Sequence, residues 1–415
     1  MKRVVKSLTA HLVSSEMSEP EARNARRHLV ALTLTKIADG LIDPKLVLSW
    51  LLGILGAPTV FVGLLVPIRE AGALLPQLVF GAILQRLRQR RWVWVIGSAV
   101  QGLAAAMIAV AAFFLTGWAA GLAICAFLAL LALARAACSV SYKDILGKTV
   151  GQSRRGAVTG LAGSVSAAAV LVFAGLLLTG VLQTRGAVIG VIAIAALAWG
   201  IAAMVLAQLN EDDSTPETTD ATGGYLAILR GDANLRRFIL VRGLLVSTAL
   251  APPYMVVLSA QGGAGLNTLG ALVLASSGAS FLSSYIWGRM ADEHSPKVLL
   301  LTGVAGGCAM LAAIFAEGLG RANSPGVIPA ILFLLMLAYH GVRQARSVYL
   351  VDISDENKRS QNAALANTAI GIILLLAGAF GGALSFIGPT GALAGFAVMA
   401  FLGGALALTL RSVEG

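Results

Sequence analysis

Long apolar segments dominate the chain and alternate with short polar ones. Each apolar segment is about 20 residues long or more, the length of helix that crosses the hydrocarbon core of a bilayer. None shows the two-residue alternation of a membrane β-strand. Six segments precede the longest polar stretch and six follow it, at residues 30–55, 58–84, 92–115, 119–142, 157–182 and 187–208, then 238–259, 267–288, 297–317, 327–351, 362–386 and 391–410. The pattern predicts an all-α membrane protein with twelve transmembrane helices.

The polar stretch between the two sets of segments indicates a linker. It begins at Asn210 with NEDDSTPETTD, which is acidic, contains Thr and Pro, and has no periodicity. We therefore expect four parts, namely a polar tail at 1–28, a six-helix bundle at 29–209, a cytoplasmic linker at 210–235 and a second six-helix bundle at 236–411.

Composition agrees with a membrane protein. Hydrophobic residues make up 57% of the chain and charged residues only 12%, unlike a soluble domain. The 47 glycines suit helices that pack closely within a bilayer. Cys125, Cys138 and Cys308 lie in apolar segments without a CxxC pair, so we predict neither a disulfide nor a metal site. No nucleotide-binding loop or catalytic triad pattern occurs, so we expect no cofactor and no enzymatic activity, and any transport draws its energy from a gradient or is passive.

The net charge of +11 is concentrated in alternate loops. The loops on one side of the membrane hold Arg86, Arg88, Arg90, Arg91, Lys148, Arg154, Arg155, Lys297, Lys358 and Arg359, and those on the other side hold only Arg185 and Arg321. By the positive-inside rule, both termini and the linker face the cytoplasm. Because this charge encodes orientation, we expect the lipid bilayer and no nucleic acid as a partner, and a monomer in a bacterial cytoplasmic (inner) membrane.

The first two apolar segments carry charged residues at membrane depth, where ionisable groups are costly and usually functional. In KIADGLIDPK, Lys36, Asp39 and Asp43 fall within an arc of roughly 60° on a helix, with Lys45 opposite. Pro44 predicts a kink there, and the next segment carries Arg69 and Glu70.

Asp39 and Glu70 are our candidates for proton coupling. Burial favours the neutral form of a carboxyl group, whereas a nearby base favours the ionised form. A structural ion pair, Asp39 with Lys36 or Glu70 with Arg69, is the alternative.

Two stretches of the first half recur in the second. Phe80-Gly81 corresponds to Trp287-Gly288 at an offset of 207 residues. Arg135, Ser139-Val140 and Asp144-Ile145 correspond to Arg343, Ser347-Val348 and Asp352-Ile353 at an offset of 208. A parallel repeat of this kind places a substrate pathway between the two halves.

These features resemble the major facilitator superfamily over nearly the whole chain. The turn that in this family reads roughly G-x-L-x-D-R-x-G-R-R is matched by Gly288, Asp292 and Lys297 in the second half and by Gly81, Arg86 and Arg90 in the first, where Gln85 replaces the acid. The resemblance implies two pseudo-symmetric six-helix bundles that alternate access to a central site. It also implies gate roles for Gly81, Arg86, Gly288, Asp292 and Lys297.

The family also bears on coupling and on one class of substrate. Arg135 resembles an arginine of the fourth helix that the family often uses in proton coupling. The Gly-Pro pair of drug antiporters is missing from the fifth segment, which makes a multidrug exporter less favoured.

Bases outnumber acids within the segments, which favours an anionic or zwitterionic small organic solute. We expect Lys36, Arg69, Arg135 and Arg343 to bind it, with H⁺ as the coupled partner. An alternative of equal weight is that Arg135 and Arg343 do not bind the solute. In that case they form hydrogen bonds to backbone carbonyls and ion pairs with acids at an inner gate. Export of amphipathic, lipid-like or drug-like compounds is the alternative transport function, and a membrane sensor or a membrane enzyme are alternatives of other classes.

The predicted orientation can be tested at the linker. A cysteine introduced at Thr218 is expected to react with a membrane-impermeant maleimide only after cells are broken, because the linker faces the cytoplasm. Labelling of this cysteine from outside intact cells would show that the topology is inverted.

Overall fold

The computed structural model describes residues 18–179, 184–214, 231–260, 266–353 and 359–411, and within these ranges the chain is almost entirely helical. The first half contains α2 (Glu19–Leu41), α3 (Val47–Ile54), α4 (Thr59–Leu74), α5 (Gln77–Gln85), α6 (Arg91–Phe114), α7 (Gly117–Thr149), α8 (Gln152–Leu178) and α9 (Arg185–Ala207). The second half contains α11 (Ala233–Leu245), α12 (Ser247–Leu250), α13 (Pro252–Ala260), α14 (Leu266–Gly318), α15 (Val327–Asp352), α16 (Arg359–Leu384), the 3₁₀ turn η2 (Ser385–Ile387) and α17 (Pro389–Ala407).

The described helices form twelve membrane spans. Within the described residues, 11 helices are long and apolar enough to cross a bilayer, with α4 and α5 forming one span and α11 to α13 another. The backbone leaves helical geometry at His294 (φ −145°, ψ 60°), which divides α14 into two spans. The remaining position is filled by α2 and α3, which are interrupted and carry charge. The expected all-α fold is confirmed.

The first span breaks where Pro44 predicts a kink. Asp43 Oδ1 accepts hydrogen bonds from the backbone N–H groups of Lys45 (2.7 Å) and Leu46 (3.1 Å), which lie directly before α3. The carboxylate thus satisfies two of the donors that a helix start leaves open. At its other end, α2 begins at Glu19, capped by Ser18, so residues 19–28 of the expected tail extend this helix.

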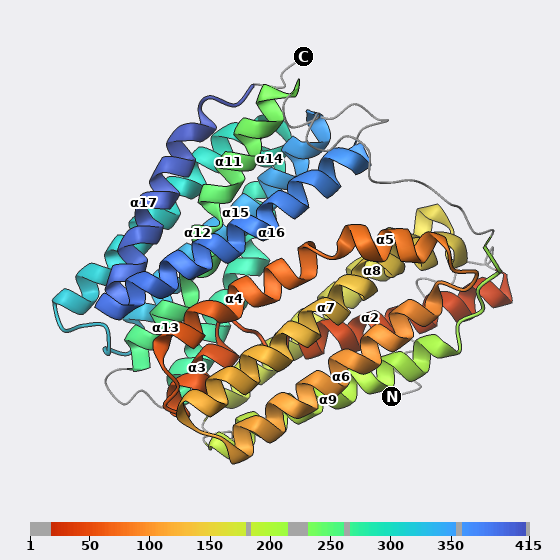
Figure 1. Ribbon diagram of the computed structural model, residues 1–415, viewed down its shortest axis with the longest axis horizontal. Coiled ribbons are helices and arrows are strands. Elements are labelled where there is room, and N and C mark those ends of the chain that lie inside the picture. The colour runs from red at the N-terminus through yellow and green to blue at the C-terminus, as the bar shows by residue number, and fades with distance from the viewer. Residues whose placement is uncertain (1–17, 180–183, 215–230, 261–265, 354–358, 412–415) are drawn as a thin grey trace.

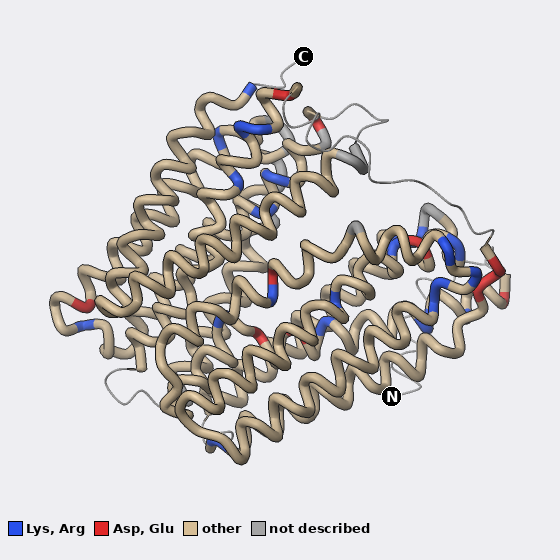
Figure 2. The backbone as a smooth tube through the Cα atoms, viewed as in Figure 1, with Lys and Arg blue, Asp and Glu red and all other residues tan. Residues whose placement is uncertain are grey.

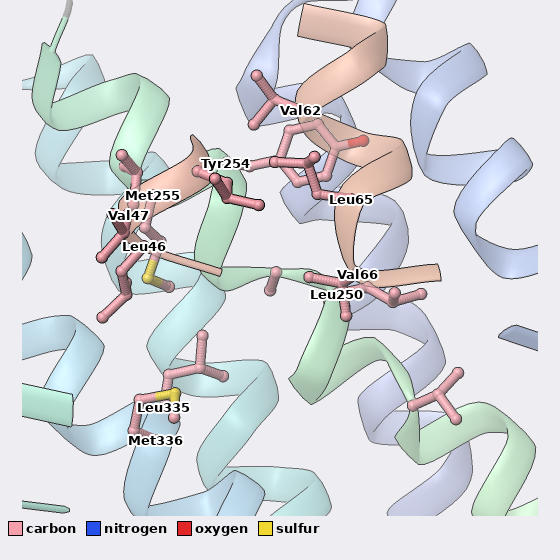
Figure 3. Packing of buried hydrophobic residues seen from close by; sticks show 14 of the residues in the cluster. Leu46, Val47, Val62, Leu65, Val66, Leu250, Tyr254, Met255, Leu335 and Met336 are labelled. Carbon is pink, nitrogen blue, oxygen red and sulfur yellow. The ribbon is translucent and has the colours of Figure 1, made fainter. Parts of the chain in front are cut away.

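The two halves form two bundles that meet at one end and diverge toward the other (Figure 1). Helix α4 lies along α16, α8 contacts α14, and α3 contacts α13. The diverging ends carry most of the charged loop residues (Figure 2). At the opposite end, apolar side chains of both bundles join one buried cluster, which includes Val62, Leu65 and Val66 of α4 and Tyr254 and Met255 of α13 (Figure 3).

Glycines allow the two bundles to approach closely where they meet. A Cβ atom on Gly378 of α16 would lie 2.1 Å from Cγ of Pro67 in α4, and one on Gly270 of α14 would lie 2.9 Å from Cβ of Leu177 in α8. Real Cβ atoms do not approach other atoms so closely. Small residues are therefore needed at these contacts, as in other close transmembrane helix pairs.

The contact at Gly378 predicts a packing defect. Gly378→Ala is expected to lower stability by about 1–3 kcal/mol, because the added methyl group overlaps the ring of Pro67. Thermal unfolding of the purified protein in detergent measures this. The matched control is Gly190→Ala in α9, where nothing lies within 4 Å of the added Cβ and alanine is the better helix former. Equal melting temperatures for the two variants would contradict the close contact.

Candidate functional site

Ten charged side chains lie together between the bundles, and we call them the central charge cluster. It contains seven bases and three acids, namely Lys36, Lys45, Arg69, Arg135, Arg242, Arg343, Arg346, Asp39, Asp43 and Glu70. They come from α2, α4, α7, α11 and α15 and from the break before α3. Both bundles therefore contribute charge to one interior region, as the duplicated sequence predicts.

Asp39 joins three helices of the first bundle. Its Oδ1 accepts a hydrogen bond from Nη2 of Arg69 on α4 at 2.8 Å, and its Oδ2 lies 2.7 Å from Nη2 of Arg135 on α7. Each carboxylate oxygen thus receives one guanidinium group, a strong charge-assisted arrangement. The side chains of Asp39 and Arg135 remain 23% and 27% exposed, so a solute or a proton can reach them.

The other two predicted residues of the first bundle lie beside this arrangement. Lys36 is within electrostatic reach of Asp39 and of Arg135 and Arg343, the two arginines that the repeat relates. Glu70 lies near Arg69, but also near Lys45 and, across the bundle interface, near Arg343 and Arg346. The sequence alternative of Asp39 paired with Lys36 is not what the structure shows, because both oxygens of Asp39 face other helices.

Lys45 connects the two bundles. Its side chain is buried, with only 8% exposed, and its Nζ lies 3.7 Å from the centre of the Tyr339 ring on α15. A cation over an aromatic ring is attracted by about 2 kcal/mol when desolvated. On a continuous helix Lys45 would lie opposite Asp39, as the sequence predicts. The structure differs, because the chain leaves the helix at residue 42.

A small pocket of about 30 Å³ lies beside Glu70, mostly within the second bundle. Its polar lining consists of Glu70, Arg242, Thr248, Tyr339, Arg343 and Arg346. Its apolar lining includes Leu74, Leu245, Val246, Ala249, Val342 and Leu374. Only Glu70 and Leu74 come from the first bundle. The pocket thus joins one acid of the first bundle to three arginines of the second.

Sequence reasoning did not select Arg346. Arg346 follows Arg343 by three residues on α15, so both side chains lie on the same helix face. This spacing is visible in the sequence and indicates that Arg346 lies beside Arg343. Arg242 was included among the bases counted in the apolar segments. Its buried position in the pocket depends on packing against α16. There its Nη2 donates a hydrogen bond to Oδ1 of Asn367 at 3.0 Å.

The predicted gate residues lie at the diverging ends. Gly81 is in α5 with open space around it, and Arg86 and Lys297 are exposed. The surroundings of Gly288 and the side chain of Asp292 lie outside the described part of the chain.

Acids of α7 and of the linker contact the bases that follow Gln85. Asp144 lies 2.6 Å from Arg90 and 3.1 Å from Lys148. Glu211, at the start of the linker, accepts from the backbone N–H groups of Arg90 (3.1 Å) and Arg91 (2.8 Å) at the start of α6. These contacts, within the described residues, tie the linker to the first bundle.

Comparison with known proteins gives one family match and several similar structures. The family model described as Major Facilitator Superfamily matches residues 238–415. Curated proteins gave no match. Among solved structures, the chain is similar to a D-xylose-proton symporter, with a TM-score of 0.71 and 12% identity over 94% of this chain and 98% of that one. It is also similar to the nucleoside transporter NupG, with a TM-score of 0.66 and 12% identity over 95% of this chain and 99% of that one.

A third similar structure is the POT family transporter PepTSo, with a TM-score of 0.71 and 12% identity over 94% of this chain and 98% of that one. At these identities the likeness shows the fold, and it extends over both bundles. The family match covers the second half, which repeats elements of the first. Residues 238–415 therefore match the Major Facilitator Superfamily, and the chain as a whole has the fold of these solved transporters.

Proposed function

We propose that this protein is a proton-coupled secondary transporter of a small anionic or zwitterionic organic solute, which it moves by alternating access between its two bundles. The observation that supports the substrate class is the excess of bases in the central charge cluster, seven against three acids. Unpaired charge in a membrane interior is costly unless a partner or water compensates it. An anionic solute is the partner that this excess favours.

Competition for the same guanidinium groups supplies a coupling mechanism. Arg69 and Arg135 are both bonded to the carboxyl group of Asp39 in the structure. A proton on Asp39 would remove its charge and leave both arginines free for a solute anion. Solute binding and protonation then favour each other, because each removes the competitor of the other. This linkage favours symport of solute and proton, with Glu70 in the same role beside Arg343 and Arg346.

The diverging bundles support an inward-facing state. With the orientation given by the positive-inside rule, the charged ends that diverge face the cytoplasm. The contacts of Lys45 with Tyr339 and of Pro67 with Gly378 then help to close the outer side. Rocking of the bundles would bring together the turns that carry Gly81, Arg86, Gly288, Asp292 and Lys297, our candidates for the inner gate. We place the transporter as a monomer in a bacterial cytoplasmic membrane.

Solute-driven proton movement tests the assigned function. The purified protein in vesicles filled with a pH-sensitive dye is expected to change luminal pH when small carboxylates or phosphate esters are added outside. Neutral sugars and organic cations are expected to give no change, because neither compensates the excess of bases. A response to neutral or cationic solutes alone, or a response to anions that requires Na⁺ instead of a pH gradient, would contradict the proposal.

Asp39→Asn tests the coupling mechanism. Asparagine resembles the protonated acid, so the variant is expected to keep solute binding, lose its pH dependence and show at least tenfold less proton flux in the same vesicles. The matched control is Asp213→Asn, an exposed acid in the linker, which should behave as the unmodified protein. Unchanged proton flux in Asp39→Asn would remove this residue from the coupling step.

A further inference from the structure

Three guanidinium groups of the second bundle face one pocket. Arg242 comes from α11, and Arg343 and Arg346 come from successive turns of α15. Arg346 is within electrostatic reach of both other arginines and of Glu70. Like charges at such distances repel each other in a medium of low dielectric constant. A structure that keeps three of them together therefore calls for a compensating anion.

The hydrogen-bond donors of this pocket are largely unused. Arg242 is 5% exposed, and its Nε is buried without a partner although Nη2 binds Asn367. Among the described residues, neither Arg343 nor Arg346 makes a hydrogen bond or ion pair. Each guanidinium carries five N–H donors. The buried Nε of Arg242 requires an explanation, whereas Arg346 is half-buried and Arg343 is exposed, so their donors are open to a ligand. A ligand with several acceptor oxygens would supply the missing partner.

The internal repeat shows why the second bundle has more positive charge than the first. Arg343 corresponds to Arg135 at an offset of 208 residues, but at the same offset from Asp39 the chain has Ser247. Ser247 is fully buried, and its Oγ has no partner. The second bundle thus keeps the arginine and lacks the acid that neutralises it in the first. The only acid lining the pocket is Glu70, which comes from the opposite bundle.

We propose that Arg242, Arg343 and Arg346 form a subsite for a dianionic phosphoryl group of the solute, which deepens the proposed function and rests on it. Three bases and one acid leave a surplus of two positive charges in the pocket. A phosphate monoester carries about −1.5 to −2 charges at pH 7 and three strong acceptor oxygens. A monocarboxylate carries only one charge. The pocket of about 30 Å³ has room for a small group. The rest of the solute would extend toward Lys36, which is within electrostatic reach of Arg343.

Glu70 acts in this proposal as an internal counter-ion that the phosphoryl group displaces. Its carboxylate is within electrostatic reach of Lys45 and Arg69 and, more weakly, of Arg346 and Arg343, so it competes with the solute for the same positive charge. Removing its charge should therefore strengthen phosphoryl binding. A purely structural role for Glu70 predicts the opposite, because loss of its contacts would weaken the pocket.

The test measures anion binding to the full chain in lipid nanodiscs by calorimetry. Inorganic phosphate and methyl phosphate are the probes, and methyl sulfate and acetate, each with one charge, are the comparison anions. Phosphate and methyl phosphate are expected to bind saturably and at least tenfold more tightly than either comparison anion. Arg242→Gln and Arg346→Gln are each expected to weaken phosphate binding about tenfold to hundredfold, the effect of losing a charge-assisted hydrogen bond. Glu70→Gln is expected to strengthen it.

Arg185→Gln is the matched control, because it removes the same charge far from the pocket, where Arg185 binds the carbonyl of Ala112. Its phosphate affinity should not change. Misfolding cannot produce the tighter phosphate binding expected for Glu70→Gln. This variant therefore still tests the proposal if an arginine variant fails to fold. Acetate binding as tight as phosphate, or phosphate binding that none of the three pocket variants alters, would overturn the phosphoryl subsite while leaving an anion transporter. Absence of binding by every anion, together with no anion-driven proton flux, would overturn the proposed function as well.

Discussion

Charge compensation inside the membrane is the constraint on which the rest of this structure depends. A guanidinium group at that depth is tolerated only with an acid, a carbonyl, water or a ligand beside it. In the first bundle Asp39 meets this need for Arg69 and Arg135, and thereby ties α2, α4 and α7 together. In the second bundle Glu70 is the only acid beside three arginines, and it crosses the bundle interface to reach them.

The packing of the bundles places these charges where both halves can use them. Glycines let α16 approach α4 and α14 approach α8, so the bundles are held together at one end by apolar contact. At the other end charged loops replace that contact (Figure 2). Apolar packing is short-ranged and depends on shape, whereas interactions between the charged residues near the centre act over longer distances. In an arrangement of this kind, the angle between the two bundles can change without exposing a new apolar core.

The duplication explains both the symmetry of the site and its departure from symmetry. Arg135 and Arg343 occupy related positions on facing bundles, yet only Arg135 has an acid within bonding distance among the described residues. The position related to Asp39 holds Ser247, so the second bundle lacks the corresponding acid and has the larger surplus of positive charge. Among the described residues, this single difference leaves Arg343 without an acid of its own bundle and makes Glu70 of the first bundle the acid that lines its pocket.

The sequence alone determined the number and order of the spans, the break at Pro44 and the correspondence of Arg135 with Arg343. Apolar length, proline geometry and internal repeats are local properties of the chain, so they can be read without coordinates. Only the tertiary structure decided that Asp39 binds Arg69 and Arg135, that Lys45 lies on Tyr339, and that Arg346 joins Arg242 in one pocket. These contacts depend on how each helix is rotated and how closely it packs against distant segments, and no periodicity within a single span encodes that rotation.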